Sequence, residues 1–107
     1  MWEEKVKIYD ELVAKCPDFK RKGKTVPYTS SNGHMFSLIN KDGELGIRLS
    51  KDAGEAFKEK YNTGDFFSHG AKMRGYVLIP DELLNDLDNL AKYLKLGYNY
   101  VMSLDPK

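Results

Sequence analysis

The feature that most constrains the fold is a helical segment near the C-terminus whose apolar surface is unusually wide. Residues 86–104 repeat apolar side chains with the 3.6-residue period of an α-helix. Plotted at about 100° per residue, the apolar arc covers roughly 240°, whereas an ordinary surface helix has a stripe of about 100°. The central face comprises Leu87, Leu90, Ala91, Leu94, Tyr98, Val101 and Met102. Such a helix has to be covered from two sides.

Four further side chains widen this face, namely Tyr93, Leu96, Tyr100 and Leu104. Two arrangements would cover them. In the first, a sheet lies beneath the helix and the N-terminal helix lies beside it. In the second, the four residues form a homodimer contact, for which tyrosine is well suited because its hydroxyl tolerates a wet rim. The sequence leaves both arrangements open.

The remaining segments predict a mixed α and antiparallel β fold. A first helix is expected over 2–16, where Pro17 ends it. Strands are expected over 25–31, 34–40 and 44–50, separated by the turn residues Asn32-Gly33 and by a turn at 40–43. Further along the chain we expect a helix from Ser50 to about residue 61, a strand over 73–79, a helical turn at 81–84 and the long helix; residues 65–72 read either as a short strand or as a packed loop.

Length and composition limit the classes of protein. A chain of 107 residues with 41% hydrophobic and 31% charged residues forms a single domain, 1–107. Seventeen basic and 16 acidic residues give a net charge of +1, so no overall field attracts nucleic acid or anionic lipid. Cys16 is the only cysteine, which excludes an internal disulfide. No apolar run suits a membrane span or a signal peptide, so we expect a cytoplasmic protein without a membrane partner.

Catalytic and metal-binding motifs are not evident. Gly23-Lys24-Thr25 resembles the end of a phosphate-binding loop, but Asp18 stands where that motif needs its first glycine. His34, His69 and Cys16 do not have the spacing of metal ligands. We therefore expect no enzymatic activity, no metal and no cofactor.

Two basic clusters are candidate binding sites. Arg48, His69, Lys72 and Arg74 could form a small anion site, since arginine and lysine bind phosphate and carboxylate through charge-assisted hydrogen bonds. The alternative is a solvated strand end. The second cluster comprises Lys20, Arg21, Lys22 and Lys24. It could contact nucleic acid, although the balanced overall charge favours a solvated loop.

Several short motifs, taken in order, resemble the N-terminal domain family of the competence regulator TfoX. They are Arg21-Lys22-Gly23-Lys24, Asn32-Gly33-His34-Met35-Phe36, Gly46-Ile47-Arg48-Leu49, Met73-Arg74-Gly75-Tyr76-Val77-Leu78-Ile79-Pro80, Tyr98-Asn99-Tyr100-Val101 and Ser103-Leu104-Asp105-Pro106-Lys107. The resemblance implies an α-β(3)-α-β(2)-α order with an antiparallel sheet flanked by helices, similar to secretion chaperones that dimerise. It also favours a true strand at 65–69, and it implies no enzymatic activity.

Together these observations favour a non-enzymatic binding or regulatory domain that self-associates and has a protein partner. The first alternative is a nucleic-acid-associated regulator of transcription or competence, acting through the basic residues at 20–24. The second alternative is a domain that binds a small anionic ligand at the cluster around Arg48 and Arg74.

Overall fold

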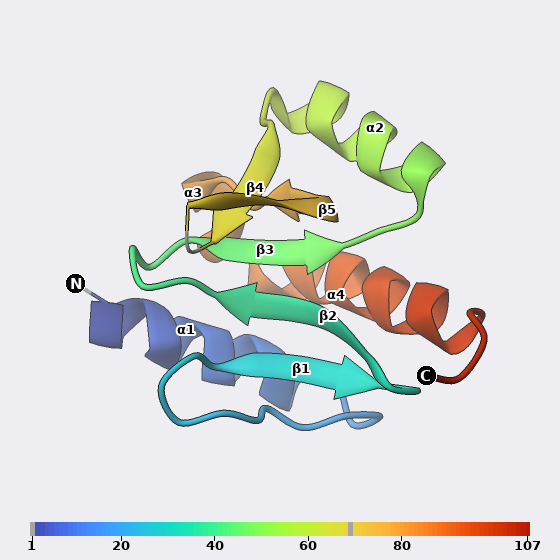
Figure 1. Ribbon diagram of the computed structural model, residues 1–107. Helices are drawn as coiled ribbons and strands as arrows, with labels where there is room; N and C mark the ends of the chain where they lie inside the picture. The colour runs from blue at the N-terminus through green and yellow to red at the C-terminus, as the bar shows by residue number, and fades with distance from the viewer. Residues whose placement is uncertain (1, 69) are drawn as a thin grey trace.

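The strands form one antiparallel sheet in which the last strand in the chain is inserted between earlier ones. The structure is a computed structural model that describes residues 2–68 and 70–107. In chain order the elements are α1 (Trp2–Ala14), β1 (Tyr28–Ser31), β2 (His34–Ile39), β3 (Leu45–Arg48), α2 (Lys51–Tyr61), β4 (Asp65–Ser68), β5 (Ala71–Leu78), α3 (Asp81–Leu84) and α4 (Leu87–Met102). The sheet order is β1-β2-β3-β5-β4, and every pairing is antiparallel (Figure 1). The predicted fold class and element order are confirmed.

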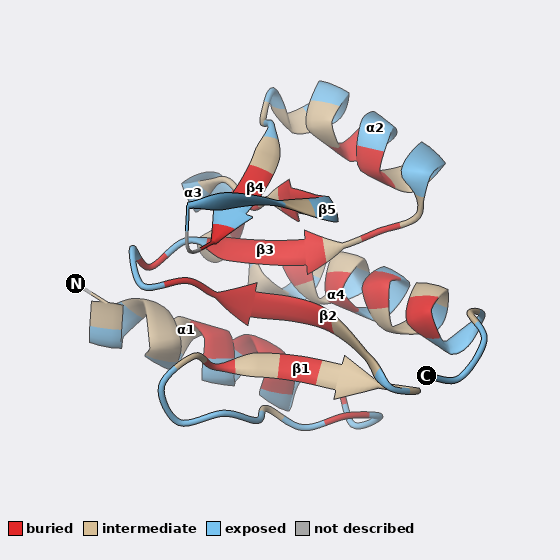
Figure 2. Cartoon of the chain, in the orientation of Figure 1, coloured by how far each residue is buried: buried red, intermediate tan, exposed pale blue. Residues whose placement is uncertain are grey.

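Three helices cover one face of this sheet. Helices α1 and α4 contact each other and lie behind β1–β3 in the view of Figure 1, while α2 packs against β5. Buried residues therefore lie along the strands and along the inner sides of the helices (Figure 2). The largest side chains of this core that are almost wholly buried are Tyr9, Leu12, Phe36, Ile47, Phe57, Val77, Leu90, Leu94 and Val101.

A β-bulge turns two consecutive residues of β2 toward the helices. Thr29 pairs with Ser37 but Ser30 pairs with Met35, so Phe36 is an extra residue in the ladder. Phe36 is fully buried in the helix-side core. The Ser37 hydroxyl lies 2.6 Å from the Tyr9 hydroxyl of α1 and also hydrogen-bonds Thr29. The bulge thus gives β2 both an aromatic anchor and a polar link to α1.

The opposite face of the sheet carries a smaller cluster. Leu38, Phe66 and Tyr76 are buried there, and no helix of the described residues is part of it. The Phe66 ring lies directly over Gly46 of β3, because a Cβ built at Gly46 would come within 2.4 Å of that ring. Glycine at position 46 is therefore a packing requirement of the cluster.

The wide apolar face of α4 is covered largely within the chain. Leu90, Leu94 and Val101 are completely buried in the helix-side core. The Tyr93 ring packs against Phe57 of α2, with ring centroids 4.8 Å apart. Cover from the sheet and the first helix was one of the two arrangements that the sequence left open, and the structure adds α2 as a third element.

Several element boundaries differ from the sequence prediction, and two of these differences lie near a proline. The first helix ends at Ala14, two residues before Cys16. Strand β1 begins at Tyr28, after Pro27, so the predicted strand over 25–27 is wrong. Proline has no N–H to donate to a strand partner, and the residue before it is conformationally restricted.

Residues 65–68 form a true strand, which decides between the two readings of that segment. Within residues 2–68 and 70–107, none of the helices has the length and apolar character that crossing a membrane requires.

Candidate anion-binding site

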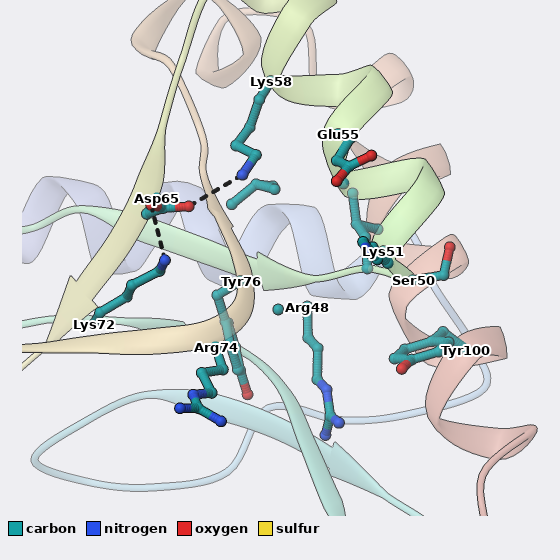
Figure 3. A pocket seen from close by; sticks show the side chains of 14 residues that line it. Arg48, Ser50, Lys51, Glu55, Lys58, Asp65, Lys72, Arg74, Tyr76 and Tyr100 are labelled. Atoms are coloured by element: carbon teal, nitrogen blue, oxygen red, sulfur yellow. Dashed lines mark hydrogen bonds and ion pairs between the residues drawn. The ribbon is translucent and has the colours of Figure 1, made fainter.

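A cavity of about 480 Å³ opens where the end of β3, the first turns of α2 and the middle of β5 meet. We call it the basic pocket (Figure 3). Five cationic and two carboxylate side chains line it, and these are Arg48, Lys51, Glu55, Lys58, Asp65, Lys72 and Arg74. The excess of positive charge contrasts with the near-neutral chain as a whole.

The β3–β5 pairing brings the two arginines together. Arg48 is the last residue of β3 and pairs with Tyr76 of β5. Gly75 adopts a positive φ of 82°, which glycine tolerates without strain, and its carbonyl accepts a hydrogen bond from the Leu49 amide at 3.0 Å. Arg74 precedes this glycine. In Figure 3 the two arginine side chains extend in the same direction on either side of the Tyr76 ring.

Two aromatic side chains fix the surroundings of Arg48. Its guanidinium carbon lies 5.5 Å from the centre of the Tyr100 ring of α4, a cation–π contact. The Tyr76 hydroxyl donates a hydrogen bond to the Met35 carbonyl at 2.8 Å. Burial raises the pKa of Tyr76 to about 12. This hydroxyl therefore stays neutral at physiological pH and does not oppose an anion.

Asp65 holds two of the lysines. Its two carboxylate oxygens lie 3.1 Å from the Lys58 ammonium and 3.3 Å from the Lys72 ammonium. Hydrogen bonds from these lysines lower the pKa of Asp65, so its carboxylate remains ionised. The contacts join α2 to the β4–β5 hairpin. By contrast, Arg48, Lys51 and Arg74 form no ion pair within the described residues.

The N-terminus of α2 lies at the same pocket. Ser50 is the N-cap, and its hydroxyl accepts a hydrogen bond from the Ala53 amide at 3.3 Å. Ser50, Lys51 and Gly54 all line the cavity. The positive end of the helix dipole adds a small favourable contribution to binding an anion.

Three of the four residues predicted for the anion cluster thus come together. Arg48, Lys72 and Arg74 line one cavity, whereas His69 lies outside the described residues. Sequence reasoning missed Lys51 and Lys58. Their signal was their spacing of seven residues, which places both on one side of the helix that directly follows β3.

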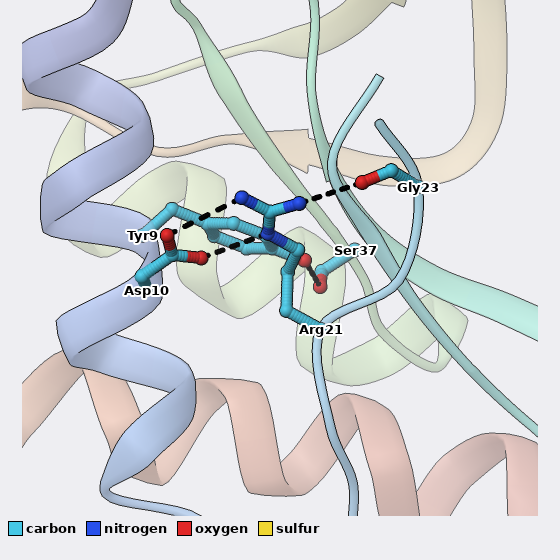
Figure 4. A network of polar contacts seen from close by, with 5 residues as sticks. All are labelled: Tyr9, Asp10, Arg21, Gly23 and Ser37. Atoms are coloured by element: carbon cyan, nitrogen blue, oxygen red, sulfur yellow. Dashed lines mark hydrogen bonds and ion pairs between the residues drawn. The ribbon is translucent and has the colours of Figure 1, made fainter. Parts of the chain in front are cut away.

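The basic residues at 20–24 are not equivalent in the structure. Arg21 donates to both carboxylate oxygens of Asp10, at 2.9 and 3.3 Å, and to the Gly23 carbonyl at 2.6 Å (Figure 4). Its guanidinium therefore connects the segment between α1 and β1 to α1. Lys20, Lys22 and Lys24 are exposed. The one arginine of the candidate nucleic-acid site is therefore engaged in a contact within the fold.

The four candidate self-association residues also differ in their surroundings. Tyr93 contacts α2, and its hydroxyl lies 3.3 Å from that of Tyr61. Tyr100 contacts Arg48, and Leu104 is half-buried. Leu96 is the exposed member, with 46% of its surface accessible.

The remaining candidate chemical groups are occupied or buried. His34 Nε2 lies 2.8 Å from the Asp105 carbonyl oxygen. Cys16 is buried, which raises the pKa of its thiol. Over residues 2–68 and 70–107, no cluster of three or more His, Cys, Asp or Glu side chains is placed to hold a metal ion. The arrangement in the basic pocket is suited to binding an anion.

A comparison of the sequence with protein-family models found no match, and a comparison with curated proteins found no significant relative.

Proposed function

We propose that this domain binds a small anionic ligand in the basic pocket. The observation that carries the proposal is the convergence of Arg48 and Arg74 on one cavity, free of ion pairs with the described residues. Sequence reasoning placed this function behind self-association and nucleic-acid binding. The pocket supports it best because the fold itself uses a residue of each alternative. Tyr93 packs against Phe57 of α2, and Arg21 pairs with Asp10.

The chemistry of the pocket favours binding. Hydrogen bonds between an ionised donor and an anion contribute about 1.5–3 kcal/mol, roughly twice as much as neutral ones. The site lies in a cavity of the size that ligand pockets have. Arg48 is oriented by Tyr100 before any ligand arrives, so less side-chain freedom is lost on binding.

The first prediction tests the pocket itself. A titration followed by amide NMR, at low ionic strength with phosphate, citrate and glycerate, should show saturable one-to-one binding of at least one anion. The largest shifts should fall at residues 48–51 and 72–76. Arg48→Met and Arg74→Met should each weaken that binding at least about tenfold, since 1.4 kcal/mol is a factor of ten.

The matched control is Lys41→Met, which removes one positive charge from the exposed turn between β2 and β3. This variant should bind as the parent does. The proposal fails if none of the three anions binds, or if Lys41→Met weakens binding as much as Arg74→Met does.

Self-association through α4 is a second candidate, favoured by the exposure of two large apolar side chains, Leu96 and Met102. We expect the sedimentation-average mass to rise with concentration, and Leu96→Glu to remove that rise, because a buried charge without a partner is costly. Ala14→Glu, which places the same charge on the exposed side of α1, should behave as the parent does. A parent chain that stays monomeric at all concentrations would contradict this candidate.

The family resemblance and a protein partner remain proposals on the sequence evidence given above. A role in transcription or competence would act through the exposed lysines at 20, 22 and 24 and should then show strongly salt-dependent binding to nucleic acid.

A further inference from the structure

We propose that the ligand of the basic pocket is a phosphate monoester whose phosphate group is held between Arg48 and Arg74. This inference rests on the proposed function and names the chemical class of the ligand. It follows from the number and direction of the unpaired donors in the pocket and from the position of its two carboxylates.

The arginine pair offers more donors than a carboxylate uses. Each guanidinium presents a planar fork of N–H groups that matches two oxygens of an anion. The two side chains extend in the same direction, one on either side of the Tyr76 ring (Figure 3). A carboxylate has two oxygens, which one fork satisfies. A phosphate monoester has three terminal oxygens and a charge of about −1.5 to −2 at pH 7, so it engages both forks.

Contacts within the fold hold the two arginines and Tyr76 in place for a single anionic group. The Tyr100 ring stacks against Arg48 and restricts its guanidinium. The backbone beside Arg74 is held by the hydrogen bond between Gly75 and Leu49. Tyr76 lies between the two arginines, is largely buried and directs its hydrogen bond away to Met35. Its ring lowers the local polarity, which strengthens the attraction between the guanidinium groups and an anion.

The rest of the cavity is less positive than the arginine pair, because two carboxylates offset its three lysines. Glu55 and Asp65 both line it, and both oxygens of Asp65 are already occupied by lysines. Glu55 has no ion-pair partner in the described part of the chain and would repel a second negative group. It would accept a hydrogen bond from a ligand hydroxyl instead. The pocket therefore fits one phosphate group joined to a neutral, hydroxyl-bearing remainder.

The test compares three probes on the intact chain by amide NMR titration: sn-glycerol 3-phosphate, glycerate and inorganic phosphate. We expect glycerol 3-phosphate to bind at least about tenfold more tightly than glycerate, because it uses both arginine forks. It should also bind more tightly than inorganic phosphate, since its glycerol part adds hydroxyls that can hydrogen-bond polar groups lining the cavity.

Two charge-preserving variants distinguish the contribution of the planar guanidinium geometry from that of the positive charge alone. Arg48→Lys and Arg74→Lys should each lose about fivefold or more in affinity for glycerol 3-phosphate, because lysine keeps the charge but not the planar fork. Arg21→Lys is the matched control: this arginine contacts Asp10 outside the pocket, so the variant should bind as the parent does. Amide spectra of each variant confirm that it is folded.

The outcomes distinguish the inference from the proposed function. Equal affinity for glycerate and glycerol 3-phosphate would overturn the phosphate assignment and leave anion binding intact. Equal affinity for inorganic phosphate and glycerol 3-phosphate would overturn the inference that the ligand is a monoester. If none of the probes binds, and citrate does not bind either, both the inference and the proposed function fail.

Discussion

Phe66→Ala should lower the free energy of unfolding by about 3–5 kcal/mol, the usual cost of removing a buried aromatic ring. Phe66 is completely buried, and its ring fills the cluster with Leu38 and Tyr76 on the sheet face opposite the helices. Because no helix of the described residues belongs to that cluster, few neighbours can move in to fill the cavity. Chemical denaturation followed by circular dichroism measures the change.

The partner of this ring provides a sharper test. Gly46→Ala in the parent should cost about 1–3 kcal/mol, since its new Cβ would lie 2.4–2.7 Å from the Phe66 ring. In the Phe66→Ala background the same substitution has space and should cost little. We therefore expect a coupling energy of at least about 1 kcal/mol in the double-mutant cycle. Additive effects of the two substitutions would show that the ring does not require glycine at position 46.

The second large effect is expected at Gly97. Alanine is normally better than glycine inside a helix by about 1 kcal/mol. Here the new Cβ would lie 2.7 Å from the Arg48 carbonyl oxygen and 3.1 Å from a methyl group of Ile47. The main chain of β3 or the whole of α4 would have to shift. Gly97→Ala should therefore destabilise the protein by about 1–3 kcal/mol, despite its better helix propensity.

Gly54 of α2 is the matched control for this prediction. A Cβ there would meet Val77 at 3.6 Å and Leu49 at 4.0 Å, which are ordinary contact distances. Gly54→Ala should therefore stabilise the protein by up to about 1 kcal/mol. The two helical glycines should thus change the denaturation midpoint in opposite directions. A shift of the same sign at both positions would contradict the close approach of α4 to β3.

Much of the fold could be predicted because its turns and helix ends depend on local chemistry. Asn32 and Gly33 both have positive φ, as the predicted two-residue hairpin turn requires. Gly43 is also left-handed, in the predicted turn before β3, and Ser50 caps α2. These features follow from neighbouring residues, so the sequence contains them directly.

Other features depend on contacts between distant segments. The contact between Phe57 and Tyr93 arises because α2 folds back beside α4, which no local pattern indicates. For the same reason the sequence suggested Tyr93 for a dimer contact. Part of its surface packs within the chain against Phe57.

The candidate site was predictable in part. Arg48 and Arg74 could be grouped because Arg48 lies on the polar face of its predicted strand and Arg74 lies beside a turn marked by Gly70 and Gly75. Lys58 could have been grouped with Lys51 by its spacing, but its ion pair with Asp65 was not predictable, because that contact depends on how β4 and α2 are placed. Ion pairs across tertiary contacts have no signature in the spacing of residues.

The insertion of β5 between β3 and β4 has a consequence for how the molecule assembles and opens. Strands β1–β3 join through short hairpins, whereas residues 46 and 78 must meet across a long stretch of chain. Closing that long loop costs more entropy and slows the step. The basic pocket spans this seam, with Arg48 on one side and Arg74 on the other. A ligand that contacts both arginines would stabilise the pairing of β3 with β5. Amide hydrogens of these two strands should therefore exchange more slowly when the ligand is bound.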